Sequence, residues 1–158
     1  MKPDSDMTAP LTGKTRARKD WMGVLARAGA GRLETALAEF GATPDYEYLR
    51  RPEIGMALVR ARAEAEGGRF NLGEMTVSRC SVRTGDGLVG HGYVAGRDKR
   101  HAELAAVFDA LLQSPAHGPK LEATIETLAG EQTRQREERD AKTAATRVNF
   151  FTMVRGED

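Results

Sequence analysis

Four side chains that can carry positive charge surround the start of one predicted helix. The segment Gly96–Glu103 reads GRDKRHAE and precedes a long apolar period. The start of a helix presents free backbone N–H groups and a partial positive charge, so it binds phosphate well. Cations are unfavourable at such a position unless something compensates them. We therefore treat the following residues as a candidate phosphate-binding site: Arg97, Lys99, Arg100 and His101.

Two other interpretations of this cluster stay open. In the first, Asp98 caps the helix, Lys99 pairs with Glu103 one turn later, and the remaining cations face water. In the second, acidic groups of a partner protein compensate the cations. The sequence does not decide between them.

Other residues with reactive side chains form no recognisable catalytic or metal-binding set. The chain has three histidines and one cysteine, and neither CxxC nor HExxH spacing occurs. Cys80 lies in the middle of a predicted strand, which favours a small buried residue over a nucleophile. We expect no catalytic residue, no metal site, and no cofactor bound by this chain alone.

Glycines recur in the segment Gly87–Gly96, which reads GLVGHGYVAG. The segment lacks the Gly-Lys-Ser/Thr ending of a P-loop, and it lies within a predicted strand rather than between a strand and a helix. Glycine inside a strand marks a bulge or a close approach of another backbone. We expect one of these two features here.

Hydrophobic periodicity predicts an α+β fold with helices at both ends of the chain. Helices are predicted at 15–28, at 32–40, after the N-cap Asp98, and at 120–128. Strands are predicted at 46–50, 54–63, 74–83 and 88–95. No helix-length segment separates the strands, so they should pair antiparallel. The predicted architecture is an antiparallel sheet of about four strands, flanked by N-terminal and C-terminal helices.

Two irregularities are predicted within the sheet. Pro52 interrupts the first apolar pattern and suggests an edge or a bend. The apolar parity of the third predicted strand shifts between Val77 and Cys80, which predicts a bulge there.

Composition indicates one domain in residues 15–158, preceded by a disordered tail in residues 1–14. The chain has 158 residues and a formal net charge of +1, so no overall electrostatic attraction to nucleic acid or membranes is expected. No apolar run approaches the ~18 residues that a membrane span needs. The first residues lack the apolar core of a signal peptide. We expect a cytoplasmic protein without membrane or nucleic-acid partners.

The C-terminal part of the chain carries apolar side chains that its own fold has difficulty burying. The segment 131–142 has almost no apolar residue, so as a helix it would be solvated or bound to a partner through polar contacts. Large apolar residues follow it, among them Phe150, Phe151 and Met153. Such residues are unfavourable in water. This pattern predicts a subunit of a larger assembly.

Two segments, Gly92–Glu103 and Arg147–Gly156, carry distinctive motifs. Together they resemble the G subunit of the bacterial carbon–phosphorus lyase system, the PhnG family. The resemblance covers about residues 16–156. Three shorter stretches agree with it: 18–22, 45–47 and 79–83.

The resemblance implies a subunit of a transferase in organic phosphonate catabolism that is not catalytic alone. Its implied partners are the H, I and J subunits of the carbon–phosphorus lyase core and, functionally, the L protein. ATP would be a substrate of the complex, whose reaction displaces adenine with a phosphonate to give ribose 1-phosphonate 5-triphosphate. The alternatives are a structural scaffold subunit only, or a small anion- or nucleic-acid-binding module.

The resemblance also marks two groups of motif positions. Gly96, Asp98 and Glu103 are motif or structural residues beside the candidate phosphate ligands. At the other end, buried aromatic and arginine side chains typically dominate interface energy. We therefore predict partner-binding roles for Phe150, Phe151, Met153 and Arg155.

Overall fold

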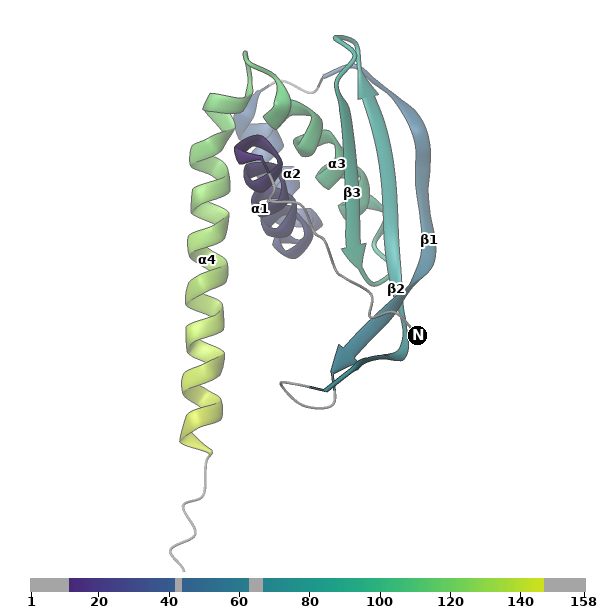
Figure 1. Cartoon of the computed structure of the whole chain (residues 1–158). Coiled ribbons are helices and arrows are strands. Elements are labelled where there is room, and N and C mark those ends of the chain that lie inside the picture. Colours follow the sequence, from purple (N-terminus) through teal and green to yellow (C-terminus); the bar gives the residue numbers. More distant parts are fainter. Residues whose placement is uncertain (1–11, 42–43, 63–66, 147–158) are drawn as a thin grey trace, which may run out of the picture.

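All helices in the described residues 12–41, 44–62 and 67–146 of this computed structural model lie on one face of a three-stranded antiparallel sheet (Figure 1). This α+β arrangement confirms the predicted fold class. The elements are α1 (Gly13–Ala28), α2 (Ala30–Phe40), β1 (Tyr46–Arg62), β2 (Arg69–Thr84), β3 (Val89–Ala95), α3 (Lys99–Gln113) and α4 (Gly118–Ala145).

The sheet has the strand order β1-β2-β3, and it contains three strands because two predicted strands are one. Strand β1 runs through Pro52 without a break, since two register shifts between Tyr48 and Glu53 absorb the irregularity. The bulge predicted in β2 was wrong, because β2 pairs with β3 without a shift from Val77 to Arg83. The parity change arises because Val77 and Cys80 point to opposite faces of a regular strand.

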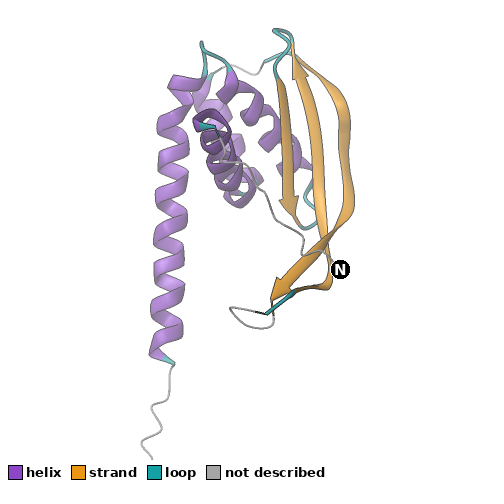
Figure 2. Cartoon of the chain, in the orientation of Figure 1, coloured by secondary structure: helices purple, strands orange, loops and turns teal. Residues whose placement is uncertain are grey.

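Helix α3 lies between the sheet and the other helices, and it forms the centre of the core (Figure 2). Eleven of its residues are buried, and Phe108 is the largest fully buried side chain of the described residues. From the sheet, Cys80, Val82 and Val94 pack against it. Because α3 is covered on all sides, its apolar residues are not confined to one stripe.

The glycines of β3 allow the backbone of α3 to approach the sheet closely. A Cβ atom added to Gly90 would lie 1.9 Å from the carbonyl oxygen of Ala106, and one added to Gly92 would lie 2.0 Å from that of Ala102. Neither distance is possible between real atoms, so both positions require glycine. Close backbone approach, the second of the two predicted features, is therefore confirmed.

Helix α4 joins the predicted helix at 120–128 and the polar segment after it into one helix of 28 residues. Its first half buries Leu121 and Leu128. Gln132 donates to the carbonyl oxygen of Val24 at 2.9 Å, and beyond it the helix is exposed and extends away from the body (Figure 1). No helix in the described part of the chain combines the length and apolar character needed to cross a membrane.

The two chain ends fall largely outside the described residues. Of the predicted tail 1–14, residues 1–11 are not described, whereas Thr12 caps α1 and Gly13 and Lys14 form its first turn. The C-terminal residues 147–158 also lie outside the described part. The predictions for Phe150, Phe151, Met153 and Arg155 concern residues of that segment.

Candidate functional site

The candidate site is the turn from β3 into α3. Gly96 has a φ of 95°, a conformation that other residues adopt only with strain. Its amide donates to the carbonyl oxygen of Thr76 at 2.9 Å, and its carbonyl accepts from Ser78 Oγ at 3.0 Å. Asp98 Oδ1 accepts from the His101 amide at 2.9 Å. These contacts confirm Asp98 as the N-cap and fix the direction in which α3 starts.

His101 points into the protein rather than toward an external ligand. Its side chain is buried, and its Nε2 lies 2.8 Å from the carbonyl oxygen of Leu25. A carbonyl only accepts hydrogen bonds, so this nitrogen carries a proton and donates. His101 therefore ties the first turn of α3 to α1.

Arg100 is held by two carboxylates. Its Nε donates to Glu34 at 3.0 Å, and one of its terminal nitrogens donates to Glu103 Oε2 at 3.1 Å. Glu103 thus pairs with Arg100 three residues earlier. Arg100 therefore takes the place at Glu103 that one interpretation of the sequence had assigned to Lys99.

Glu103 also joins α3 to the first strand. Its Oε1 accepts from the hydroxyl of Tyr46 at 2.7 Å, and the hydroxyl of Tyr48 donates to the same atom. Burial acts to raise the pKa of Glu103, but the hydrogen bonds from Tyr48, Tyr46 and Arg100 outweigh it, so the pKa lies below its usual range. Burial and the contact with Glu103 raise the pKa of Tyr46 far above its usual range. Glu103 therefore stays ionised at neutral pH and Tyr46 stays protonated, which suits a structural contact better than proton transfer.

Arg97 and Lys99 are the remaining candidate phosphate ligands, and both are exposed. The structure thus brings the four predicted residues to one helix start but turns them in different directions. His101 faces the core, Arg100 is engaged by carboxylates, and the other two face solvent. A phosphate-binding role for this cluster stays a prediction.

Asp109 forms a buried polar centre that the sequence reasoning missed. Its carboxylate is fully buried and accepts from Arg18 at 2.7 and 3.1 Å. It also accepts from Trp21 Nε1 and from the His91 amide, each at 2.9 Å. Four hydrogen bonds from two elements, α1 and β3, compensate the burial of this charge. In the sequence, the sign of this buried centre was that Asp109 is a single carboxylate within the apolar run of α3.

Cys80 lies in a buried position that does not suit a nucleophile. Burial raises the pKa of the Cys80 thiol to about 11, and its Sγ lies 3.4 Å from the carbonyl oxygen of Arg50. A buried thiol with this pKa is protonated at neutral pH and is a poor nucleophile. Among the described residues, no three histidine, cysteine, aspartate or glutamate side chains gather as metal ligands.

Comparison with known proteins agrees with the family resemblance that the sequence motifs indicate. The profile of the family described as "Phosphonate metabolism protein PhnG" matches residues 16–156. The chain belongs to the PhnG family. A protein of Rhizobium meliloti (strain 1021) is 48% identical over 141 residues, which cover 89% of this chain and 90% of that protein. It is named alpha-D-ribose 1-methylphosphonate 5-triphosphate synthase subunit PhnG.

In this PhnG family member, several motif residues have structural contacts. Arg18 and Trp21, from the Arg-x-x-Trp stretch near the start, both bind Asp109. Asp98 and Glu103, from the turn into α3, cap the helix and bind β1. These residues hold the helices on the sheet.

Proposed function

We propose that this chain is a subunit of a synthase in organic phosphonate catabolism. The enzyme would transfer the ribose triphosphate of ATP to a phosphonate with release of adenine. The observation that carries the proposal is the 48% identity to the Rhizobium meliloti synthase subunit, which extends over nine-tenths of that protein. Identity of this extent along both chains favours a shared place in a shared assembly.

In this proposal the chain supplies no catalytic group of its own. The buried carboxylate Asp109 is fully hydrogen-bonded, Glu103 is held by tyrosines and an arginine, and Cys80 is protonated. The chemistry would lie on cytoplasmic partners, the H and I subunits acting with the L protein, while the J subunit completes the core. ATP would be a substrate of the complex, and no cofactor would be held by this chain alone.

The test is reconstitution of the synthase with and without this chain, measured as adenine release from ATP and methylphosphonate. We expect release to fall to the level without enzyme when the chain is omitted, and to return when the folded chain is added back. The chain alone should release none. An undiminished rate in its absence, or turnover by the isolated chain, would refute the proposal.

We also infer that the start of α3 binds the triphosphate of the substrate. The exposure of Arg97 and Lys99 beside a helix start supports this inference, because both can reach an anion that the backbone N–H groups also attract. Arg100 stands beside them, and His101 contributes by fixing the turn through Leu25. A scaffold subunit without such a role is the competing possibility.

Replacing Arg97 by alanine distinguishes the triphosphate-binding role from the scaffold role. If Arg97 binds the triphosphate, the KM for ATP in the reconstituted complex should rise about tenfold, as expected for the loss of a hydrogen bond between charged groups. Arg134→Ala removes an exposed arginine from α4 and serves as the matched control. Unchanged ATP affinity and turnover for Arg97→Ala would leave only the scaffold role.

We further propose that the C-terminal residues anchor the chain in its partners. Phe150, Phe151 and Met153 would fill apolar pockets, and Arg155 would pair at their rim, as is typical of residues that dominate interfaces. Support comes from the sequence alone, since these residues lie outside the described part. Truncation after Arg147 should abolish co-purification with the other subunits.

A further inference from the structure

The sheet extends into a two-stranded arm, which we define as residues 54–62 of β1 and 69–76 of β2. Strand β3 pairs with β2 only between Val77 and Arg83. Beyond that point β1 still pairs with β2, from Met56 opposite Thr76 to Arg62 opposite Arg69, and Ile54 opposite Ser78 lies at the base of the arm. The arm therefore projects past the rest of the sheet (Figures 1 and 2). A two-stranded ribbon is marginally stable in water unless something covers it.

Large apolar side chains are exposed on the arm. Summed over both faces of the arm, they present on the order of 500 Å² of apolar surface, and exposed apolar surface of this size often marks a site of protein–protein interaction. Stable interfaces bury about 800 Å² per partner, so the arm alone could supply much of one interface. The exposed fractions are Ile54 46%, Met56 68%, Leu58 57%, Phe70 44%, Leu72 64% and Met75 40%.

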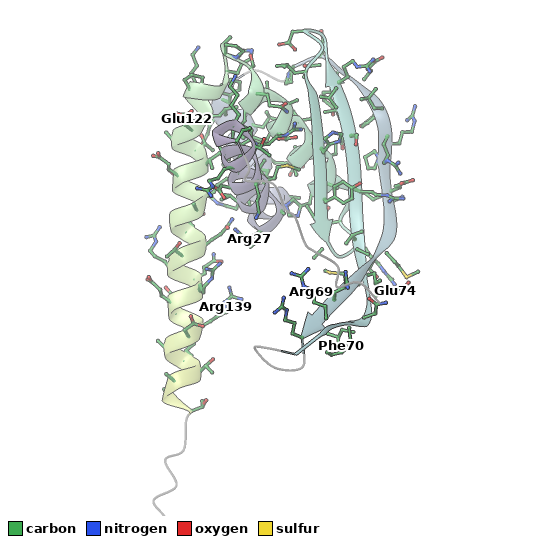
Figure 3. All side chains as sticks on the ribbon, viewed as in Figure 1. Arg27, Arg69, Phe70, Glu74, Glu122 and Arg139 are labelled. Atoms are coloured by element: carbon green, nitrogen blue, oxygen red, sulfur yellow. The ribbon has the colours of Figure 1, made fainter. Side chains whose placement is uncertain are left out.

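This apolar surface covers both faces of the arm. Ile54, Met56 and Leu58 alternate along β1, and the pairing of Ile54 with Ser78 places them on the face that the helices cover further along the sheet. Met75 pairs with Ala57 and so points to the other face. Figure 3 shows Arg69 and Phe70, near the tip, on opposite sides of the ribbon. An occupant must therefore enclose the arm rather than cover one side.

The charges of this segment balance. Between positions 54 and 76 the sequence has Arg60, Arg62 and Arg69 against Glu64, Glu66 and Glu74. A sequence segment without net charge does not favour nucleic acid or an anionic membrane. Recognition of the arm should be mainly apolar and only weakly dependent on salt.

The backbone of the arm also has an open edge. On the side of β2 away from β1, residues 70–75 pair with no strand among the described residues. Such an edge readily pairs with an extended segment of another chain. A suitable occupant therefore offers both apolar side chains and backbone hydrogen-bonding groups.

We propose that the arm inserts into an apolar groove of another subunit of the synthase. The inference rests on the proposed function, because it requires that the chain works as a subunit. A second copy of this chain fits less well. It would bring an arm with two apolar faces of its own, so pairing two arms would leave a face of each in water. A groove in a different subunit can cover both faces at once.

The test uses the full-length chain carrying Leu58→Asp and Leu72→Asp together. Both side chains are more than half exposed, so the fold should persist, which thermal unfolding of the isolated variant can check. Co-expressed with the other synthase proteins, the tagged variant should recover at least about tenfold less of its partner, because charges enter an apolar interface. The control, Leu49→Asp, replaces an exposed leucine of β1 outside the arm by the same charged residue and should recover partner as the wild type does.

Hydrogen exchange on the wild-type chain provides a second measurement. Amides of residues 69–76 should exchange more slowly in the complex than in the free chain. Equal recovery of partner by the double aspartate variant, or unchanged exchange, would overturn the inference. So would a dimer of the isolated chain that the same variant dissociates. If the wild-type chain itself recovers no synthase protein, the proposed function is refuted, and with it the inference about the arm.

Discussion

Replacement of Asp109 by asparagine is expected to lower the free energy of unfolding by about 3 kcal/mol. The carboxylate is fully buried and binds Arg18, Trp21 and the amide of His91. An amide has one acceptor oxygen and its NH₂ group would face other donors, so part of this network would lose its acceptor. Arg18 would also lose its charge partner, although its side chain is 32% exposed and can still reach water. That exposure keeps the expected loss at the lower end of values for broken buried pairs.

Denaturant unfolding of the isolated chain measures this effect. Asp20→Asn is the matched control, because it makes the same change at an exposed position next to Trp21. The control should change the free energy of unfolding by no more than about 0.5 kcal/mol. A loss below about 1 kcal/mol for Asp109→Asn would mean that the buried network is not important for stability.

Gly92→Ala should destabilise the protein about as strongly. The added Cβ would lie 2.0 Å from the carbonyl oxygen of Ala102 and 2.9 Å from the amide nitrogen of Ala106. Both are backbone atoms of α3, so relief requires the whole helix to move away from the sheet. Overpacking of this kind typically costs 1–3 kcal/mol, and we expect about 3 kcal/mol because no flexible side chain can yield.

The comparison for this variant is Gly73→Ala. Gly73 also lies in a strand, but a Cβ there would meet nothing within 4 Å. It should unfold at the same denaturant concentration as the wild type or slightly above it, because alanine restricts the unfolded chain. Indistinguishable midpoints for Gly92→Ala and the wild type would contradict the close packing of β3 on α3.

Features set by local sequence could be predicted well. Asp98 is a good N-cap followed by a clear apolar period, and the structure has α3 starting directly after it. The α+β class followed from the order of the helical and strand patterns. The glycines of β3 indicated close backbone approach because strands otherwise disfavour glycine.

Features that depend on distant pairing could not be predicted. The contact between Arg18 and Asp109 spans 91 positions, and no periodicity relates the two residues. Pro52 correctly suggested an edge, because β1 lies at the edge of the sheet. The division of β1 into two strands at this point was wrong, because pairing with β2 carries the strand through it. The arm could not be predicted from the sequence, because its length depends on where β3 stops pairing with β2. That point is a property of the whole sheet rather than of any single strand.

At the candidate site, the sequence indicated which residues gather but not where they point. His101 and Arg97 belong to the same helix start, yet one is buried against Leu25 and the other faces solvent. Tyr46 and Tyr48 were not connected with Glu103 because they precede it by more than fifty residues. Side-chain direction here is decided by the neighbouring elements.

The native mass of this chain after co-expression with the other synthase proteins tests most directly whether it works as a subunit. The full-length chain should appear in a complex much heavier than its own 17.2 kDa. The chain truncated after Arg147 should be absent from that complex, while its isolated fold, built from the described elements, stays intact. A full-length chain found only at its own mass, with the remaining proteins assembled and active without it, would contradict this function.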